Sequence, residues 1–375
     1  MAKEGSGKSL ITDEKLAEVK SWVGNYAPVR HPFITEVTRD SIRHFAEGIG
    51  DTNPLFNDPE YARKTKYGGL VAPPTLHLAM IGQMRQGLPG VHNLWSGAEI
   101  NASRPMRAYE PGNATMGISA VEEKIGQFAG RMIYMEHTSF YKGKEGNPIT
   151  TLKLWGMRTE RAGAVEKGKY KTISLKHWTT DEIKAVEADI EREEVRGSNP
   201  RYWEDVQVGD SLTPVVKGPL TVADMVAWIA GWGTRPFIRA HRAMLEFRKR
   251  HPGFAVTNGL GVPDTPEAVH WDNELARSIG APGPYDFGPE RVAWLGNLMT
   301  NWMGDDGFLK RIRAEVRRFN LVGDVTWCKG NVTKKRGDGN ERLVDCDIWG
   351  ENQRGEKTMI GEATVVLPSK AKPVS

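Results

Sequence analysis

The amino-acid sequence predicts an α+β fold made of two copies of one domain, each a long helix followed by long antiparallel strands. Three observations lead to this prediction. Segments of about twenty residues that start at Phe56 and at His270 match without a gap, 214 positions apart. An apolar, helix-like run follows each segment, and strand-like runs follow each helix. A chain of 375 residues is long enough to hold both copies.

The internal repeat determines which residues correspond in the two copies. The same separation of 214 positions pairs Asp58 with Asp272. Upstream, Thr38 matches Thr221 at a separation of only 183 positions. The second copy therefore carries 31 extra residues between its two matched blocks. This insert includes "FIRAHRAMLEFRKRHPGFAVTNGLG", for which we expect one helix and a glycine-rich loop.

The helix of each copy is predicted from the apolar run that follows its matched segment. After Pro74 comes "LHLAMIGQM", and after Gly288 comes "PERVAWLGNLMTNWM". Pro289 suits the first turn of a helix, where no backbone N–H is needed. The second run has apolar residues at helical spacing, so we expect that helix to be buried on one face. These apolar positions are Val292, Leu295, Leu298, Met299 and Trp302.

Each copy ends in strand-like runs separated by turn residues. The first is "RMIYMEHTSFYKGKEGNPITTLKLWGM", and the second is "RLVDCDIWGENQRGEKTMIGEATVVLP". Between the copies, "KHWTTDEIKAVEADIEREEVRGSNP" is charged, helical in composition and ended by Ser-Asn-Pro, which is typical of a linker. We therefore expect a first domain over residues 15–160, a linker over 161–200 and a second domain over 201–370.

Composition restricts the class of function. The net charge is only +4 and no long basic run occurs, so we expect no nucleic-acid partner, whereas a small phosphate-bearing ligand fits. Cys328 and Cys346 are the only cysteines, which excludes a disulfide framework and suits a reducing, cytoplasmic location. No metal-ligand pattern is convincing, and no apolar run is long enough to span a membrane.

The stretch "GDTNPLFNDPEYA" resembles the hydratase signature of the MaoC-like hot-dog proteins, the (R)-specific 2-enoyl-CoA hydratases. The resemblance covers most of both halves and implies an α+β double hot-dog, in which an antiparallel sheet wraps a central helix in each half. In the family pattern a catalytic His follows Asn-Pro-x, where this chain has Phe56. The resemblance implies that the first half has lost its catalytic residues and accommodates the acyl group, while the second half does the chemistry.

The resemblance implies reversible hydration of a trans-2-enoyl-CoA to a 3-hydroxyacyl-CoA, with no cofactor. His270 matches the family's catalytic His, and histidine is the residue type best suited to proton transfer near neutral pH. Gly288 stands where the fold presents a backbone N–H at the start of the central helix, a site for a developing oxyanion. Pro74, its counterpart in the first copy, has no N–H.

The second catalytic group stays open at this point. The family has an Asp five residues before its His, but Thr265 stands there in this chain. Asp264 is six residues before His270 and is the favoured candidate; Glu267 is the second. The upstream alignment puts Thr234 in the Asp position. Turn formation is the alternative role of such an aspartate.

Other residues are assigned by position or charge. The predicted substrate-binding residues are Phe56, Tyr285, Phe287 and Arg317. Arginine and lysine suit coenzyme A phosphates, although surface charge is the alternative for each of Lys64, Lys66, Arg317 and Arg318. Asp51 and Asn53 are expected to form the turn before the helix. His241 and His251, in the basic insert, are expected on a solvated face.

Three functions remain in competition. The first is a hydro-lyase acting on an acyl-CoA, with the insert and aromatic content favouring a bulky or branched acyl group. The second is a non-catalytic acyl-CoA-binding subunit, which the displaced Asp favours. The third is thioester hydrolysis, which hot-dog folds also support. Paired hot-dog domains commonly assemble further, so we expect a homo-oligomer.

Overall fold

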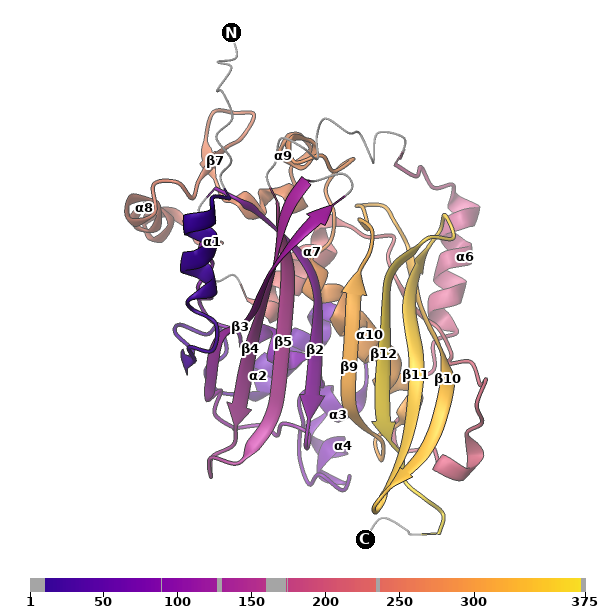
Figure 1. The fold of residues 1–375 in the computed structure, drawn as a ribbon. Coiled ribbons are helices and arrows are strands. Elements are labelled where there is room, and N and C mark those ends of the chain that lie inside the picture. The colour runs from indigo at the N-terminus through magenta and orange to yellow at the C-terminus, as the bar shows by residue number, and fades with distance from the viewer. Residues whose placement is uncertain are drawn as a thin grey trace.

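The computed structural model describes residues 11–88, 90–126, 130–159, 173, 175–233 and 237–371 (Figure 1). Within them the strands form a ten-stranded antiparallel sheet and a separate two-stranded hairpin. The strands are β1 Ala27–Pro28, β2 His92–Ala102, β3 Ala114–Gly126, β4 Gly130–Lys142, β5 Pro148–Thr159, β6 Val215–Lys217, β7 Val256–Thr257, β8 Pro263–Asp264, β9 Phe308–Val316, β10 Thr326–Asp338, β11 Glu341–Asn352 and β12 Lys357–Val366. The α-helices are α1 Asp13–Lys20, α2 Arg39–Ile49, α3 Pro54–Asn57, α4 Pro59–Arg63, α6 Thr180–Glu191, α7 Val222–Trp232, α8 His241–Arg250, α9 Asn273–Ser278 and α10 Gly288–Met303. The 3₁₀ helices are η1 Leu76–Ala79, η2 Trp203–Asp205 and η3 Pro266–His270.

The order of strands in the large sheet confirms the duplicated fold. From one edge the order is β1-β3-β4-β5-β2, and from the other it is β6-β10-β11-β12-β9. Corresponding strands of the two copies thus occupy corresponding places. The copies meet at the centre, where β2 pairs with β9 from Gly97–Glu315 to Asn101–Arg311 (Figure 1). The predicted domain boundaries remain a prediction.

Helices α2 and α7 are equivalent in the repeat and cross each other closely. The side chains of Thr38 and Thr221, which correspond in the repeat, cap their first turns. A Cβ atom on Gly48 would lie 2.8 Å from the carbonyl oxygen of Ala227, and one on Gly231 would lie 2.3 Å from that of His44. Only glycine allows two backbones to approach so closely. Gly48 of α2 and Gly231 of α7 correspond in the repeat, and each allows its helix to approach the backbone of the other.

Helix α10 is the central helix of the second half, as predicted, and it lies against the large sheet (Figure 1). It contacts strands of both halves, β2 as well as β9 to β12. The expectation that it is buried on one face only is wrong, because every residue of Pro289–Met303 is buried. Its polar residues are buried with it, among them Arg291, Asn297 and Asn301.

The predicted helix of the first half is wrong: only η1 forms, and no regular structure is assigned from Met80 to Leu88 among the described residues there. Tertiary donors take the carbonyl groups that a helix would use. The indole of Trp232 donates to the carbonyl of Leu78 (2.8 Å), and the Tyr141 hydroxyl donates to that of His77 (3.2 Å). The N–H of Gln83 donates to the carbonyl of Arg30 (2.9 Å), which pairs the segment with the β1 side of the fold.

The linker and the insert have the expected elements. Thr179 begins α6 with a capping box, and Trp327 ties the helix to the sheet through Asp189 (3.0 Å). Residues 161–172 and 174 of the predicted linker lie outside the described residues. The insert forms α8 and the glycine-rich β7–β8 hairpin, and Phe247 is the only buried residue of α8. In the described part of the chain, no helix is both long and apolar enough to cross a membrane.

Candidate active site

His270 ends η3, a single 3₁₀ turn that starts from Pro266. Thr265 caps this turn by accepting a hydrogen bond from the N–H of Glu267 (3.3 Å). The imidazole Nδ1 lies 2.7 Å from the carbonyl oxygen of Tyr285. A carbonyl oxygen only accepts, so Nδ1 carries the hydrogen and Nε2 of the neutral ring keeps its lone pair. The tautomer needed for a base at Nε2 is thereby selected.

Aromatic rings hold the imidazole in place. The ring of Phe287 is stacked on it at a centroid distance of 3.8 Å, and the ring of Tyr285 meets it edge-on at 4.7 Å. Trp232, at the end of α7, packs against Phe287 at 5.6 Å. The side chain of His270 is 11% exposed, so a small edge of the ring is open to a reactant. The two predicted substrate-binding aromatics therefore surround the predicted catalytic histidine.

The carboxylate beside the imidazole belongs to Glu267, whose Oε2 lies 3.5 Å from Nε2 of His270. The carboxylate of Asp264, the favoured candidate, is engaged elsewhere. Its Oδ1 accepts from the N–H of Thr265 (2.7 Å), and its Oδ2 accepts from the amide of Asn258 (3.3 Å). Asp264 is thus held in the β7–β8 hairpin. Thr234, aligned with the family's Asp, lies outside the described residues.

Gly288 begins α10 directly after Phe287, so its N–H is one of those with no partner inside the helix. A Cβ atom at this position would lie 2.2 Å from the ring of Trp95, a residue of β2 in the first half. Glycine is therefore required where the helix start meets this indole. Gly288 thus contacts an aromatic side chain of the other half and directly follows Phe287, the ring stacked on His270.

A buried ion pair fixes the segment that carries these groups. Asp286 lies between Tyr285 and Phe287, and its carboxylate accepts from Nε of Arg291 at 2.7 Å. The amide of Asn320 donates to the same carboxylate (3.0 Å). Burial raises the pKa of Asp286, and Arg291 opposes this shift. Because the pair is complete and hydrogen-bonded, it holds the start of α10 in one position.

A cavity with an empty space of about 290 Å³ lies next to Trp95. Met84, from the irregular segment that replaces the predicted helix, lines it together with Met135 and Leu154 of the first-half sheet. His137 also lines it, and burial lowers the pKa of that imidazole. The first half thus provides space beside the start of α10.

The other predicted residues are distributed around the molecule. Arg317 follows β9, is half exposed and pairs with Glu315 (2.5 Å). It is two residues from Phe319, whose ring packs on Tyr285 at 4.7 Å. Lys66 donates to the carbonyl of Asp306 (2.8 Å), close to the opposite end of α10.

The remaining predicted residues line a second cavity, form a turn or lie at the surface. Phe56 is also away from His270: it lines a second cavity formed with the C-terminal end of α10. Asp51 and Asn53 form the expected turn, in which Asp51 accepts from the N–H of Asn53 (2.9 Å). The side chain of Arg318 pairs with Glu356 (3.4 Å). Lys64 is exposed at the end of α4.

Two aromatic residues at the site were missed by sequence reasoning, Trp95 and Trp232. Neither belongs to the matched motif, and Trp95 reaches Gly288 only because β2 lies beside the second half of the sheet. No local pattern signals such a contact. The proximity of Glu267 to His270 had a signal, since residues three apart lie on one side of a 3₁₀ turn.

Comparisons with known proteins agree with this architecture. The family model described as the FAS1-like dehydratase domain region matches residues 21–152 of this chain. A UPF0336 protein of Streptomyces avermitilis is 34% identical over 115 residues, which cover 28% of this chain and 75% of that protein.

Two solved structures share the whole fold. A MaoC-like dehydratase has a TM-score of 0.64 at 17% identity, covering 94% of this chain and all (100%) of its own. A conserved hypothetical protein of Mycobacterium tuberculosis, described as a double hot-dog fold, has a TM-score of 0.52 at 9% identity, covering 92% of this chain and 96% of its own. The chain therefore belongs to the UPF0336 family, and its fold is that of the MaoC-like double hot-dog structures.

Proposed function

We propose that this protein is a hydro-lyase that reversibly adds water to a trans-2-enoyl-CoA to give a 3-hydroxyacyl-CoA. One observation carries the proposal. The hydrogen bond from Nδ1 of His270 to the carbonyl of Tyr285 orients the imidazole next to Phe287, the residue before α10, and selects the neutral tautomer that has its lone pair on Nε2. The ring of His270 is stacked on Phe287, directly before the α10 N-terminus, and a base and a helix N-terminus are the two elements that hydration of a conjugated thioester requires.

In the proposed mechanism Nε2 of His270 takes a proton from water while the water oxygen bonds to the β-carbon of the substrate. Glu267, 3.5 Å from Nε2, helps to hold this water. The electron pair of the double bond moves to the thioester oxygen, which accepts a hydrogen bond from the Gly288 amide. The positive end of the α10 dipole favours this charge. The electron pair on the thioester oxygen then re-forms the carbonyl while the α-carbon takes the proton from Nε2 of His270, which completes a syn addition and restores the neutral imidazole; dehydration is the reverse path.

The acyl group is proposed to extend past Trp95 into the cavity lined by Met84, Met135 and Leu154. This direction follows because Trp95 contacts Gly288 and also lines that cavity. The irregular segment that replaces the first-half helix leaves room for a bulky or branched group. Arg317, two residues from Phe319 in the chain, is the proposed partner of a coenzyme A phosphate. An assembly of several copies remains part of the proposal.

The test is the change of His270 to alanine. Loss of the base should lower kcat for a trans-2-enoyl-CoA by about 10²–10⁴-fold without unfolding the protein. The decrease in absorbance of the conjugated thioester measures turnover, and circular dichroism measures folding. The matched control is His251→Ala, because His251 ends α8 in the insert and should leave turnover unchanged.

Three results separate the competing functions. Hydration removes the conjugated absorbance without releasing a thiol, whereas hydrolysis releases free coenzyme A. Binding of the enoyl-CoA with no turnover of either kind would instead favour a non-catalytic acyl-CoA-binding subunit. Full activity of a folded His270→Ala variant would overturn the mechanism.

A further inference from the structure

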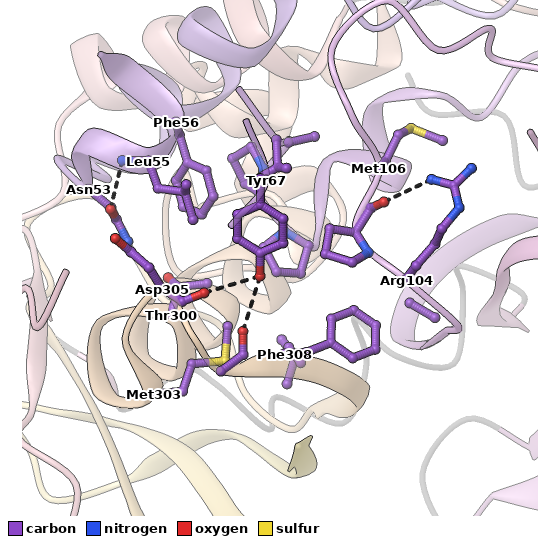
Figure 2. Close-up of a pocket in the computed structure, with 18 of the residues that line it drawn as sticks. Asn53, Leu55, Phe56, Tyr67, Arg104, Met106, Thr300, Met303, Asp305 and Phe308 are labelled. Atoms are coloured by element: carbon purple, nitrogen blue, oxygen red, sulfur yellow. Dashed lines mark hydrogen bonds between the residues drawn. The ribbon is translucent and has the colours of Figure 1, made fainter. Parts of the chain in front are cut away.

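A cavity separate from the candidate active site lies at the other end of α10 (Figure 2). It has an empty space of about 530 Å³ and opens to solvent. Figure 2 shows Tyr67 at the centre of its lining, with Asp305 and Thr300 on one side and Met106 and Arg104 on the other. Most of its walls are apolar, which is the usual character of a small-molecule site.

The cavity is the first-half counterpart of the candidate active site. Phe56 and Pro74, which line it, correspond in the repeat to His270 and Gly288. The second half contributes Met303, the last residue of α10. At 1.5 Å per residue, the sixteen residues of α10 separate its ends by about 22 Å. A ligand in this cavity is therefore independent of chemistry at His270.

One hydrogen-bond acceptor in the cavity wall is the imidazole of His77, which is 3% exposed. Its Nδ1 donates to the carbonyl oxygen of Pro74 (3.2 Å), so Nε2 holds the lone pair of the neutral ring. Burial lowers the pKa of His77 to about 4, which keeps the ring neutral at physiological pH. Within the described part of the chain, Nε2 has no hydrogen-bond partner.

A second acceptor is the carboxylate of Asp305, which is 5% exposed. Its Oδ2 accepts from the hydroxyl of Tyr61 (2.5 Å), and the side chain of Asn53 also hydrogen-bonds to this carboxylate, so it is less available to a ligand than His77. Nearby donors are already engaged. The Tyr67 hydroxyl donates to the carbonyl of Asp305 (3.1 Å), and the Arg104 guanidinium donates to Glu110 (2.6 Å).

We propose that this cavity is a second binding site, for an apolar molecule that carries a hydroxyl donor. The apolar walls bury its hydrocarbon part, and the unpaired Nε2 of His77 receives its hydroxyl hydrogen. A buried acceptor without a partner costs free energy, so a ligand that donates to it is favoured over one that does not. The copy that lost its catalytic histidine thus keeps a ligand site of different chemistry.

The test compares two probes of similar shape, n-octanol and n-octyl fluoride, by isothermal titration of the full-length protein. The alcohol donates a hydrogen bond and the fluoride does not, so n-octanol should bind at least about fivefold more tightly. His77→Phe keeps a ring but removes the acceptor, and should reduce the affinity for n-octanol to that for the fluoride. His270→Ala, about 22 Å away along α10, should leave the affinity for n-octanol unchanged.

Three results would overturn the proposal: equal binding of both probes to the unaltered protein, no binding of n-octanol, or loss of its binding in His270→Ala. The last would assign the alcohol to the candidate active site. The comparison of probes requires no substitution, so it decides the question even if His77→Phe does not fold. Ala72→Leu, which narrows the cavity, should weaken both probes, and unchanged affinities would also contradict the assignment.

Discussion

The spacing of three residues between Glu267 and His270 determines which carboxylate accompanies the imidazole. In a 3₁₀ turn, residues three apart lie above one another, and η3 is such a turn. The sequence favoured Asp264 because the family pattern was carried across the insert, where the spacing changes. A carboxylate six residues before the histidine instead falls in the β7–β8 hairpin and satisfies its turn.

Side-by-side substitution of the two carboxylates tests this assignment. Glu267→Gln should lower kcat for the enoyl-CoA by about 10²-fold or more, since it removes the charge next to Nε2. Asp264→Asn should change kcat less than about threefold, because an amide still accepts from the Thr265 N–H. Steady-state kinetics on both variants measures this. A larger loss in Asp264→Asn would restore Asp264 as the second catalytic group.

The pKa of Asp51 predicts how stability varies with pH. Burial raises the pKa of this carboxyl to about 6, and the Asn53 N–H and Lys217 oppose the shift. Since the raised pKa lies above the unfolded value of 3.8, the folded state holds the proton longer. The free energy of unfolding therefore falls as the pH rises from about 4 to about 6 and is then constant.

Asp51→Asn should remove the decrease in the free energy of unfolding that occurs as the pH rises. The amide oxygen still accepts from the N–H of Asn53, so the free energy of unfolding should exceed that of the unaltered protein above pH 6 by on the order of 2 kcal/mol. Below about pH 4 the difference should vanish. Urea denaturation at several pH values measures it, with exposed Asp40→Asn as the control. An Asp51→Asn variant less stable than the unaltered protein at pH 7 would contradict this account.

At the scale of elements, α10 and η1 show what an apolar run determines. Both apolar runs have helical spacing, but only the second forms a continuous helix, α10. This helix contacts strands of both halves. The run after Pro74 meets the indole of Trp232 and the backbone of Arg30, which take over its hydrogen bonds. Those partners are more than 40 residues away in the sequence, so the local spacing of apolar residues cannot predict them.

The crossing of α2 and α7 gives a stability prediction. Gly231→Ala places a Cβ atom 2.3 Å from the carbonyl oxygen of His44, so the helices must separate. The free energy of unfolding should fall by about 1–3 kcal/mol. Gly69→Ala is the control, because no atom lies within 4 Å of the added Cβ, and it should cost little or nothing. Chemical denaturation compares them, and equal stability of the two variants would show that the crossing tolerates a methyl group.

At the scale of the whole molecule, the fold follows from the repeat and the family resemblance. Matching the halves identified the duplication, the insert and the places of His270 and Gly288. It could not supply contacts between the halves, such as Trp95 on Gly288 or Asp305 beside Phe56, because these depend on how β2 and β9 join. The fold was therefore more predictable than the composition of either cavity.

The two halves should unfold as one unit. The central β2–β9 pair makes the large sheet continuous, and one apolar core includes residues from Ile34 to Leu367. Neither half can lose its structure without exposing part of that core. Thermal unfolding followed by far-ultraviolet circular dichroism and by tryptophan fluorescence should give one transition at the same temperature. Two transitions, or different midpoints, would mean that the halves are thermodynamically independent.

The placement of Trp95 over Gly288 and of Asp305 beside Phe56 affects how the gene tolerates recombination. Each copy therefore contributes a side chain to the site of the other copy. A chimera that joins one copy from this chain to the other copy from a relative inherits two mismatched sites, even if every motif is intact. A chimera intended to carry the ligand specificity of one relative should therefore take both β2 and the complete α10 region from that relative.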